Sequence, residues 1–238
     1  MIATSSDESR LFKDSNIKFI LTNRLSGFSE NGFESLNLGN NTNDSLVESN
    51  KFLLKSHLKT NKIHFINQIH SNKILTLQST SNELLGDGDG IFCANKGQFA
   101  MVCVADCNPI LLYSKAKNCF TLLHAGRAGL EQKIIQKACE LIDSSDIIAF
   151  VGASIRECCY EIDGELLEFY KKEYSDFLVA KGSRFHLDMI AMIKSEFRNF
   201  GIKNFEIYPK CTCCRKEFFS YRRDKNCGRF ALICALKK

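Results

Sequence analysis

Three apolar segments of the sequence each end in reactive side chains followed by a turn. They are FINQIHSN (65–72), VCVADCNP (102–109) and TLLHAGRAG (121–129). Strand ends that lead into tight turns often hold functional groups on a rigid support. The side chains of His70, Cys107 and His124 are ligands that zinc accepts. Three protein ligands leave a fourth position for water or substrate, which is the pattern of a catalytic zinc site.

The spacing of these three residues does not establish a metal site by itself. They are far apart in the sequence, and no short motif such as CxxC or HExxH joins them. Each histidine also suits a hydrogen-bonding role at a strand end, and Cys107 suits a place in the core or a turn. A further alternative is a metal-free cysteine hydrolase acting on a cell-wall precursor, with Cys107 as nucleophile and His124 as its base.

The elements that must position these side chains are mostly short strands. Hydrophobic patterning predicts strands at 17–24, within 62–78, and in IFCAN, QFAMVCVAD, PILLYS, CFTLLHAG, IIAFVGAS, FEIYP and RFALICAL. Helices are expected from Asn43 or Asp44 to about Lys59, over 129–143, and near 164–176 and 187–199. This order favours an α+β fold with mixed β-sheets over a regular βαβ alternation. We expect one domain over residues 1–238.

Composition narrows the class of protein. The chain has 238 residues, 45% hydrophobic and 25% charged, with a formal net charge of +5 and scattered Lys and Arg. This composition is typical of a globular protein and gives no indication of nucleic-acid binding. The amino terminus lacks the pattern of a secretory signal, and no segment approaches the roughly 18 apolar residues of a membrane span. The expected location is the cytoplasm.

The sequence contains 12 cysteines, which we expect to be reduced. Most suit a role as small buried apolar residues, and Cys103, Cys119 and Cys234 lie in apolar runs. The remaining thiols include the pair Cys158–Cys159 and three in CTCC (Cys211, Cys213, Cys214). These suggest a second metal site or a redox switch, but we interpret them as ordinary thiols. Adjacent cysteines point to opposite sides of an extended chain, which argues against one shared site.

A series of longer motifs runs through almost the whole chain, from about residue 22 to 236. In order they are TNRLSGFSENGFESLNLG, NQIHSNKI, GDGDGIFC, VCVADCNPILLY, LLHAGRAGL, VGASIRECCYEID, FHLDMI and CTCCRKEFFSYRRDKNCGRFALICAL. The series resembles the laccase-domain family, also described as multicopper polyphenol oxidase-like. Its bacterial members include peptidoglycan-editing factors and purine nucleoside enzymes. The most specific matches are ADCNP followed by HAG, and FFSYRRD followed by GR.

The resemblance implies a set of metal ligands, an activity and a fold. The ligands are the histidine of QxH, the cysteine of ADC and the histidine of HAG, which here are His70, Cys107 and His124. The implied activity is zinc-dependent phosphorolysis of adenosine, inosine, guanosine and methylthioadenosine, with adenosine deamination and a link to peptidoglycan editing. The implied fold is a layered α/β/β/α sandwich. Purine nucleosides and phosphate are the expected partners, without nucleic acid, membrane or an obligate protein partner.

Residues near the predicted zinc suggest further roles. Zinc deaminases use a water that attacks C6 of adenine, helped by a separate acid or base, and Asp106 and Asp89 are our candidates. Phosphorolysis needs an anion site, which the start of the helix after His124 could provide. Asn37 is a candidate for reading a base or ribose hydroxyl. The candidate phosphate-binding arginines are Arg127, Arg222, Arg223 and Arg229.

Two segments depart from the pattern of the family. Where the family has HAGWRG, this chain has HAGRAG, with Arg127 in place of Trp and Ala128 in place of Arg. The family's GPAIGPCCYEV becomes GASIRECCYEI, so Arg156 and Glu157 replace Gly-Pro, and Arg156 is a candidate compensating cation. The metal ligands are unchanged, so the departures bear on phosphate binding.

Two other functions stay open at this point. One is copper-dependent phenol oxidation, which usually requires several metals or a tuned copper site. Besides the two candidate ligands, the chain has only three histidines, His57, His64 and His186. The other is a binding protein without catalysis, whose function would survive the loss of Cys107.

Overall fold

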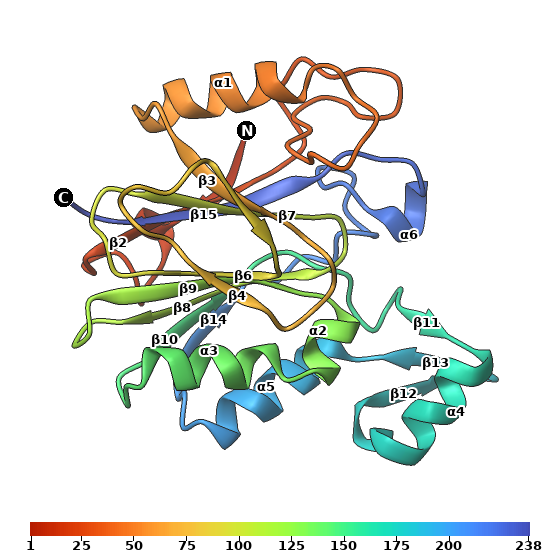
Figure 1. Cartoon of the computed structure of the whole chain (residues 1–238). Helices are drawn as coiled ribbons and strands as arrows, with labels where there is room; N and C mark the ends of the chain where they lie inside the picture. Colours follow the sequence, from red (N-terminus) through yellow and green to blue (C-terminus); the bar gives the residue numbers. More distant parts are fainter.

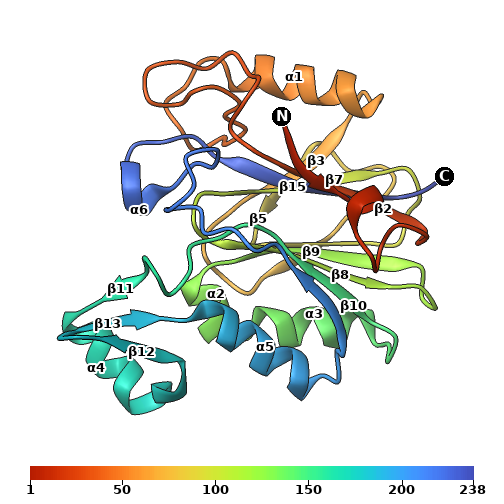
Figure 2. The same ribbon diagram turned by 180° about the vertical axis from the view of Figure 1, so that it is seen from behind.

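Two six-stranded sheets pack face to face in the computed structural model, which describes residues 1–238 (Figures 1 and 2). The first sheet has the order β1 (Ile2–Ser5), β2 (Ile17–Thr22), β15 (Phe230–Leu236), β7 (Phe99–Val104), β3 (Ile63–Asn67), β5 (Leu84–Asp87). The second has the order β14 (Asn204–Ile207), β10 (Ile148–Val151), β8 (Asn108–Ser114), β9 (Cys119–Ala125), β6 (Gly90–Cys93), β4 (Ile74–Thr76). Both sheets are mixed, because β3 runs parallel to β7 and β5 in the first sheet, and β14 and β4 run parallel to β10 and β6 in the second, while the other neighbours are antiparallel.

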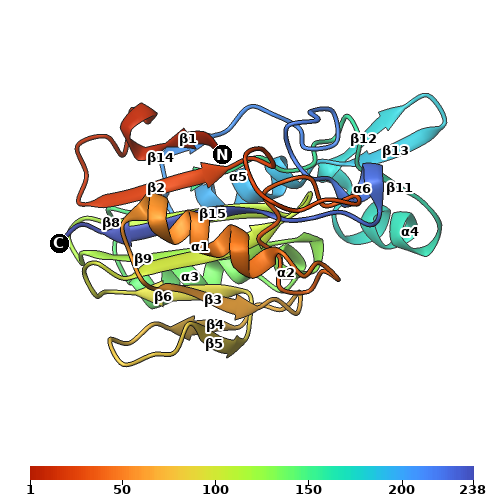
Figure 3. The same cartoon turned by 90° about the horizontal axis from the view of Figure 1, so that it is seen from above.

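Helices cover the two outer faces of this pair of sheets. Helix α1 (Val47–Leu58) lies over the first sheet, as the view from above shows (Figure 3). Helices α3 (Ile134–Ile142) and α5 (Met189–Asn199) lie under the second sheet (Figure 1). The predicted α+β fold with a layered α/β/β/α sandwich is therefore confirmed. No helix combines the length and the apolar character needed to cross a membrane.

The alternation of side chains along the central strands explains these layers. In β15, Phe230, Leu232 and Cys234 belong to the core between the sheets, whereas Ala231 and Ile233 face the core under α1. Strands β7, β8 and β9 divide their side chains between two cores in the same way. Successive side chains of a strand point to opposite faces, so strands that are apolar throughout must be covered on both sides.

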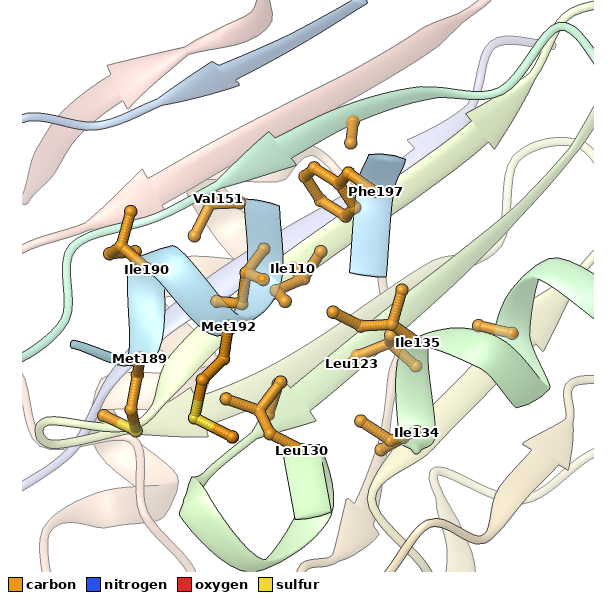
Figure 4. Close-up of a cluster of buried hydrophobic side chains, with 14 of the residues drawn as sticks. Ile110, Leu123, Leu130, Ile134, Ile135, Val151, Met189, Ile190, Met192 and Phe197 are labelled. Carbon is orange, nitrogen blue, oxygen red and sulfur yellow. The ribbon is translucent and has the colours of Figure 1, made fainter. Parts of the chain in front are cut away.

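The third core joins the second sheet to α3 and α5. Leu123 and Ile110 from the sheet meet Ile135 and Phe197 from the two helices (Figure 4). Leu130 of the short helix α2 (Arg127–Glu131) belongs to the same core. This packing fixes α2 directly after β9, next to the end of the strand that carries His124.

The structure corrects two predicted helices. The helix expected from Asn43 or Asp44 begins later, at Val47, because Asp44 accepts hydrogen bonds from Leu46, Ser29 and Asn37 in the preceding loop. The single helix predicted over 129–143 is wrong. It is divided into α2 and α3 at Lys133, which has a left-handed φ of 63°. Both helices direct apolar side chains to one core, which contains Leu130 of α2 and Ile134, Ile135 and Ala138 of α3.

A small three-stranded sheet that the sequence analysis did not predict lies beside the sandwich. Its strands are β11 (Glu161–Ile162), β13 (Arg184–Leu187) and β12 (Leu178–Lys181), and α4 (Gly164–Glu173) lies next to it (Figure 1). Two short 3₁₀ helices occupy Ser6–Glu8 and Ser175–Phe177, and helix α6 (Tyr221–Asp224) lies in the Cys- and Arg-rich loop. The small sheet extends the end of the sandwich at which α2 and α6 also lie.

Candidate active site

The structure brings His70, Cys107 and His124 together. Their ligand atoms all lie within 4.8 Å of one another, and the two imidazole rings are 4.9 Å apart between centroids. His124 is in β9, Cys107 directly precedes β8, and His70 lies in the loop after β3. Strands β8 and β9 are antiparallel neighbours in which Pro109 pairs with His124, so Cys107 must lie close to this histidine. The strand register thus accounts for the meeting of Cys107 and His124, whereas His70 comes from a loop.

The carboxylate of Asp89 holds the ring of His124 and the backbone of the His70 loop in place. The side chain is completely buried, and its Oδ1 lies 2.7 Å from Nδ1 of His124. The backbone N–H groups of His70 and Ser71 donate to the same carboxylate at 3.0 and 2.6 Å. Hydrogen bonding at Nδ1 leaves Nε2 of His124 as the free ring nitrogen, as a metal-bound histidine requires. Asp89 therefore acts as a positioning residue.

The electrostatics of the group favour a thiolate at Cys107. Burial opposes ionisation, but the charge of His124 and hydrogen bonds from His124 and His70 outweigh it and lower the pKa of the thiol to about 6. Burial also opposes a charge on His124, but Cys107 and Asp89 together raise its pKa to about 9. A thiolate is the form in which cysteine binds metals and acts as a nucleophile.

The backbone around the group adopts unusual conformations. His70 has a φ of 60° and Asp106 a φ of 91°, both in the region that side chains disfavour. A Cβ atom on Gly126 would lie 2.9 Å from Sγ of Cys107 and 3.3 Å from Cδ2 of His70. Only glycine leaves the donor atoms room at this position. Strained backbone that is held by its surroundings is common at functional sites.

The three side chains line a cavity of about 550 Å³. A cavity of this size is in the range of small-molecule sites, roughly 300–1,000 Å³. Its wall contains aromatic and apolar side chains as well as several cations. Among the lining residues are Phe65, Met101, Ile155, Tyr160, Met189, Tyr221, Arg127, Arg222, Lys225 and Arg229.

Four of the other predicted site residues line this cavity. They are Asp106, Arg127, Arg222 and Arg229. Asp106 accepts hydrogen bonds from the hydroxyl of Thr212 at 2.6 Å and the N–H of Arg222 at 2.7 Å. The guanidinium of Arg222 donates to the carbonyl of Glu161 and lies over the ring of Tyr160. Nη1 of Arg127 forms an ion pair with Glu131 at 2.7 Å.

The structure does not bring Asn37, Arg223 and Arg156 to the cavity. The side chain of Asn37 is completely buried and binds Thr42, Asp44 and two backbone N–H groups. Arg223 donates to the carbonyls of Thr212 and Phe218, and Arg156 donates to Ser154 and to the carbonyl of Tyr208. These hydrogen bonds stabilise the conformations of the surrounding loops. Asp89 also lies behind the cavity wall. The helix after His124, at whose start an anion site was expected, is the five-residue α2, which is too short to provide such a site by itself.

Sequence reasoning did not find three residues that bear on the site. Gln68 makes two hydrogen bonds to the backbone of Cys103, which attach the His70 loop to β7. Tyr160 and Lys225 line the cavity. The sequence contains a signal for Gln68 and for Tyr160, since Gln68 is in the NQIH motif and Tyr160 is in CCYE. Nothing in the local sequence marks Lys225.

Comparison with known proteins identifies the family. The profile of the family described as multi-copper polyphenol oxidoreductase laccase matches residues 18–237. The chain belongs to this family. The predicted resemblance to the laccase-domain family is thereby confirmed, and the matched region includes every residue of the site described above.

Named relatives in this family are purine nucleoside phosphorylases. One from Campylobacter jejuni is 34% identical over 194 residues, which cover 77% of this chain and 83% of that protein. Another from Mycobacterium tuberculosis is 29% identical over 228 residues, or 91% of each chain. The crystal structure of the hypothetical protein YfiH from Bacillus licheniformis is similar, with a TM-score of 0.88 at 25% identity, and 95% of each chain is covered.

Proposed function

We propose that this protein is a zinc-dependent purine nucleoside phosphorylase that acts on adenosine, inosine, guanosine and methylthioadenosine and also deaminates adenosine. The observation that carries this proposal is the convergence of His70, Cys107 and His124 on one wall of a cavity with cationic and aromatic sides. The names of the relatives support the same reaction.

The donor set fits zinc. Two imidazole nitrogens and one thiolate are typical zinc ligands, and a set of three leaves one position for substrate or water. The close approach of Gly126 keeps the space beside Cys107 and His70 free of a side chain. Asp89 fixes His124 as carboxylates commonly do for metal-bound histidines. When bound, zinc would supply Lewis-acid chemistry that polarises a substrate or water oxygen.

Cationic side chains on the cavity wall could bind phosphate, the second substrate of the proposed reaction. Phosphorolysis joins a phosphate oxygen to C1′ of the ribose as the bond from C1′ to the purine breaks. Arg127, Arg222, Arg229 and Lys225 line the cavity and offer N–H donors for the phosphate. A guanidinium has five N–H donors, so the ion pair of Arg127 with Glu131 leaves donors available. The family motif HAGWRG has an arginine where this chain has Ala128. We assign to Arg127 the phosphate contact that Ala128 cannot make.

Aromatic side chains on the cavity wall could stack on the purine base, and an acidic side chain could transfer a proton to it. Phe65, Tyr160 and Tyr221 line the cavity and offer surfaces on which a purine can stack. Asp106 is the carboxylate on the cavity wall, whereas Asp89 lies behind it. We therefore assign to Asp106 the transfer of a proton from water to a purine ring nitrogen. This transfer would occur when the glycosidic bond breaks, and also when water displaces the C6 amino group, which leaves as ammonia.

Chromatography of adenosine incubated with the zinc-loaded protein tests this proposal. With phosphate we expect adenine and ribose 1-phosphate. Without phosphate we expect inosine, which should form more slowly than adenine forms in the presence of phosphate. Cys107→Ser should abolish both products, whereas Cys139→Ser is the matched control, because Cys139 is buried in the core beside α5. Unchanged adenosine from metal-replete protein would contradict the proposal.

A second candidate function is the metal-free cysteine hydrolase. The observation that favours it is the line from Cys107 through His124 to Asp89, which has the order of nucleophile, base and orienting acid. A chelator distinguishes the two candidates. It should abolish the phosphorylase, but it would leave a cysteine hydrolase active.

Zinc is also to be distinguished from copper. Two histidines and one cysteine form the donor set of mononuclear copper sites as well. The other histidines, His57, His64 and His186, do not belong to any group of metal-ligand side chains, so the chain has one site that contains histidine. Phosphorolysis and deamination involve no electron transfer, which favours zinc. The link to peptidoglycan editing and the cytoplasmic location stay predictions.

A further inference from the structure

A second group of metal-ligand side chains lies outside the cavity. It consists of Cys158, Cys159, Cys211 and Cys214, whose sulfur atoms all lie within 4.8 Å of one another. Sγ of Cys214 is 3.6 Å from that of Cys158 and 3.3 Å from that of Cys159. None of the four lines the cavity. We call these residues the four-cysteine cluster.

A tight turn brings the adjacent cysteines to one side. The N–H groups of Cys159 and Tyr160 both donate to the carbonyl of Arg156 at 2.9 Å, so the chain turns here. The sequence analysis argued against a shared site on the assumption that this segment is extended. That assumption is wrong, and the turn lets Cys158 and Cys159 direct their sulfurs to the same point.

The other two cysteines have the spacing of a metal half-site. Cys211 and Cys214 form a C-x₂-C pair, which is common in structural zinc sites. The N–H of Thr212 donates to the carbonyl of Ser154 at 3.1 Å, and Ser154 and Cys211 form a parallel bridge. These contacts hold the loop after β14 beside the loop after β10, and both pairs of sulfurs meet there.

The distances in the cluster suit one tetrahedral ion. Bonds of about 2.3 Å from zinc to sulfur place tetrahedral sulfurs roughly 3.8 Å apart. The observed separations of 3.3 and 3.6 Å are close to this value, and no two sulfurs of the set are more than 4.8 Å apart. They exceed the length of a disulfide bond, about 2.05 Å, and all four cysteines are free. We propose that the four-cysteine cluster binds a single structural zinc ion.

Backbone N–H groups of Cys214, Arg156 and Cys213 donate hydrogen bonds to the sulfur of Cys211. The sulfur of Cys213 does not belong to the cluster and packs against the core under the second sheet. Cys213 is therefore the natural control for substitutions in the cluster.

The proposed ion would brace one wall of the candidate active site. Thr212, between the two cysteines of the half-site, donates to Asp106. Nη1 of Arg222 donates to the carbonyls of Cys159 at 3.4 Å and Glu161 at 2.9 Å. The loops held together by the ion are thus the loops that position Asp106 and Arg222. The proposal depends on the four sulfurs alone and does not require the proposed activity.

Metal content per chain tests the proposal. We would purify the full chain with zinc and a phosphine reductant and measure zinc by mass spectrometry. The wild type should hold about two equivalents, and Cys214→Ser and Cys107→Ser about one each. The control Cys213→Ser should keep about two. A Cys214→Ser variant with the zinc content of wild type would overturn the proposal, whatever the result for Cys107→Ser.

Cobalt provides a readout that does not depend on activity. Cobalt bound by four thiolates in a tetrahedron gives intense thiolate-to-metal absorption, which should be present in Cys107→Ser and Cys213→Ser. In Cys214→Ser this absorption should fall to the much weaker level that the single thiolate of Cys107 gives. Two other findings would overturn the proposal. They are iron with labile sulfide in the purified protein, and a disulfide between Cys214 and either Cys158 or Cys159 in the protein purified with zinc.

Discussion

The His70 group and the four-cysteine cluster offer metal ligands in opposite ways. His70, Cys107 and His124 sit at strand ends and line a cavity, with buried Asp89 behind them. The cluster is built by two loops, and Cys158 and Cys214 are exposed at the surface. Three ligands beside a cavity leave a place for substrate, whereas four sulfurs fill a tetrahedron. On this difference we propose a catalytic role for the first site and a structural role for the second.

The largest expected effect comes from removing a ligand of the first site. Cys107→Ser should lower phosphorolysis of adenosine by more than about 100-fold, because loss of a ligand exceeds the effect of losing its supporting groups. The melting temperature of the variant should stay near that of wild type, which separates loss of chemistry from loss of fold. Activity within about 10-fold of wild type would contradict the assignment of chemistry to this site.

The two regions should also differ in thiol reactivity once the metal is stripped. The pKa of Cys107 is lowered to about 6, whereas burial and the hydrogen bonds with Cys211 and Cys214 raise that of Cys158 to about 12. Thiolate at Cys107 therefore forms as the pH rises through about 6. At pH 7, iodoacetamide should modify Cys107 roughly 100-fold faster than Cys158, as peptide mass spectrometry would measure. Equal rates would refute this contrast.

The supporting carboxylate should have a smaller effect than a ligand. Asp89→Asn keeps the shape of the side chain but weakens the hydrogen bond to His124, so zinc affinity at the first site should fall about 10- to 100-fold. A competition titration with a zinc chelator would measure this change. Asp87→Asn is the matched control in the same GDGDG segment, since Asp87 is exposed and contacts Asn67. Equal affinities for the two variants would show that Asp89 does not support the metal.

The phosphate contact should give an effect of about 10-fold. Arg127→Ala removes a charge-assisted hydrogen bond and should raise the KM for phosphate about 10-fold, with a smaller change in the KM for adenosine. Steady-state kinetics with each substrate varied would check this expectation. Arg198→Ala, at the exposed end of α5, should leave both constants unchanged. An unchanged KM for phosphate in Arg127→Ala would exclude this arginine from the anion site.

The smallest effect on catalysis should come from the four-cysteine cluster. Cys214→Ser should lower kcat only a few-fold, because Asp106 and Arg222 keep their other contacts. Loss of about 2 kcal/mol of stability would lower the melting temperature by about 4–8 °C. Calorimetry of the zinc-loaded proteins would measure this shift beside Cys213→Ser. A loss of activity as large as that of Cys107→Ser would mean that the two regions are not distinct.

Local pattern alone determined much of the fold and part of the site. The apolar runs in β7, β8, β9 and β15 require cover on both faces, which leads to stacked sheets with outer helices. The motifs that end in His70, Cys107 and His124 indicated these residues before any contact was known. Such information is local, since it depends on the alternation of neighbouring side chains and on short motifs.

Only the tertiary structure decided which distant groups meet. The carboxylate of Asp89 reaches His124 because β6 and β9 pair in a particular register, and the four-cysteine cluster forms because the loops after β10 and β14 lie side by side. The left-handed Lys133 that divides α2 from α3 likewise serves the packing of both helices against one core. Which strands become neighbours and which loops come into contact depend on the packing energy of the whole core. A short segment of sequence therefore cannot specify them.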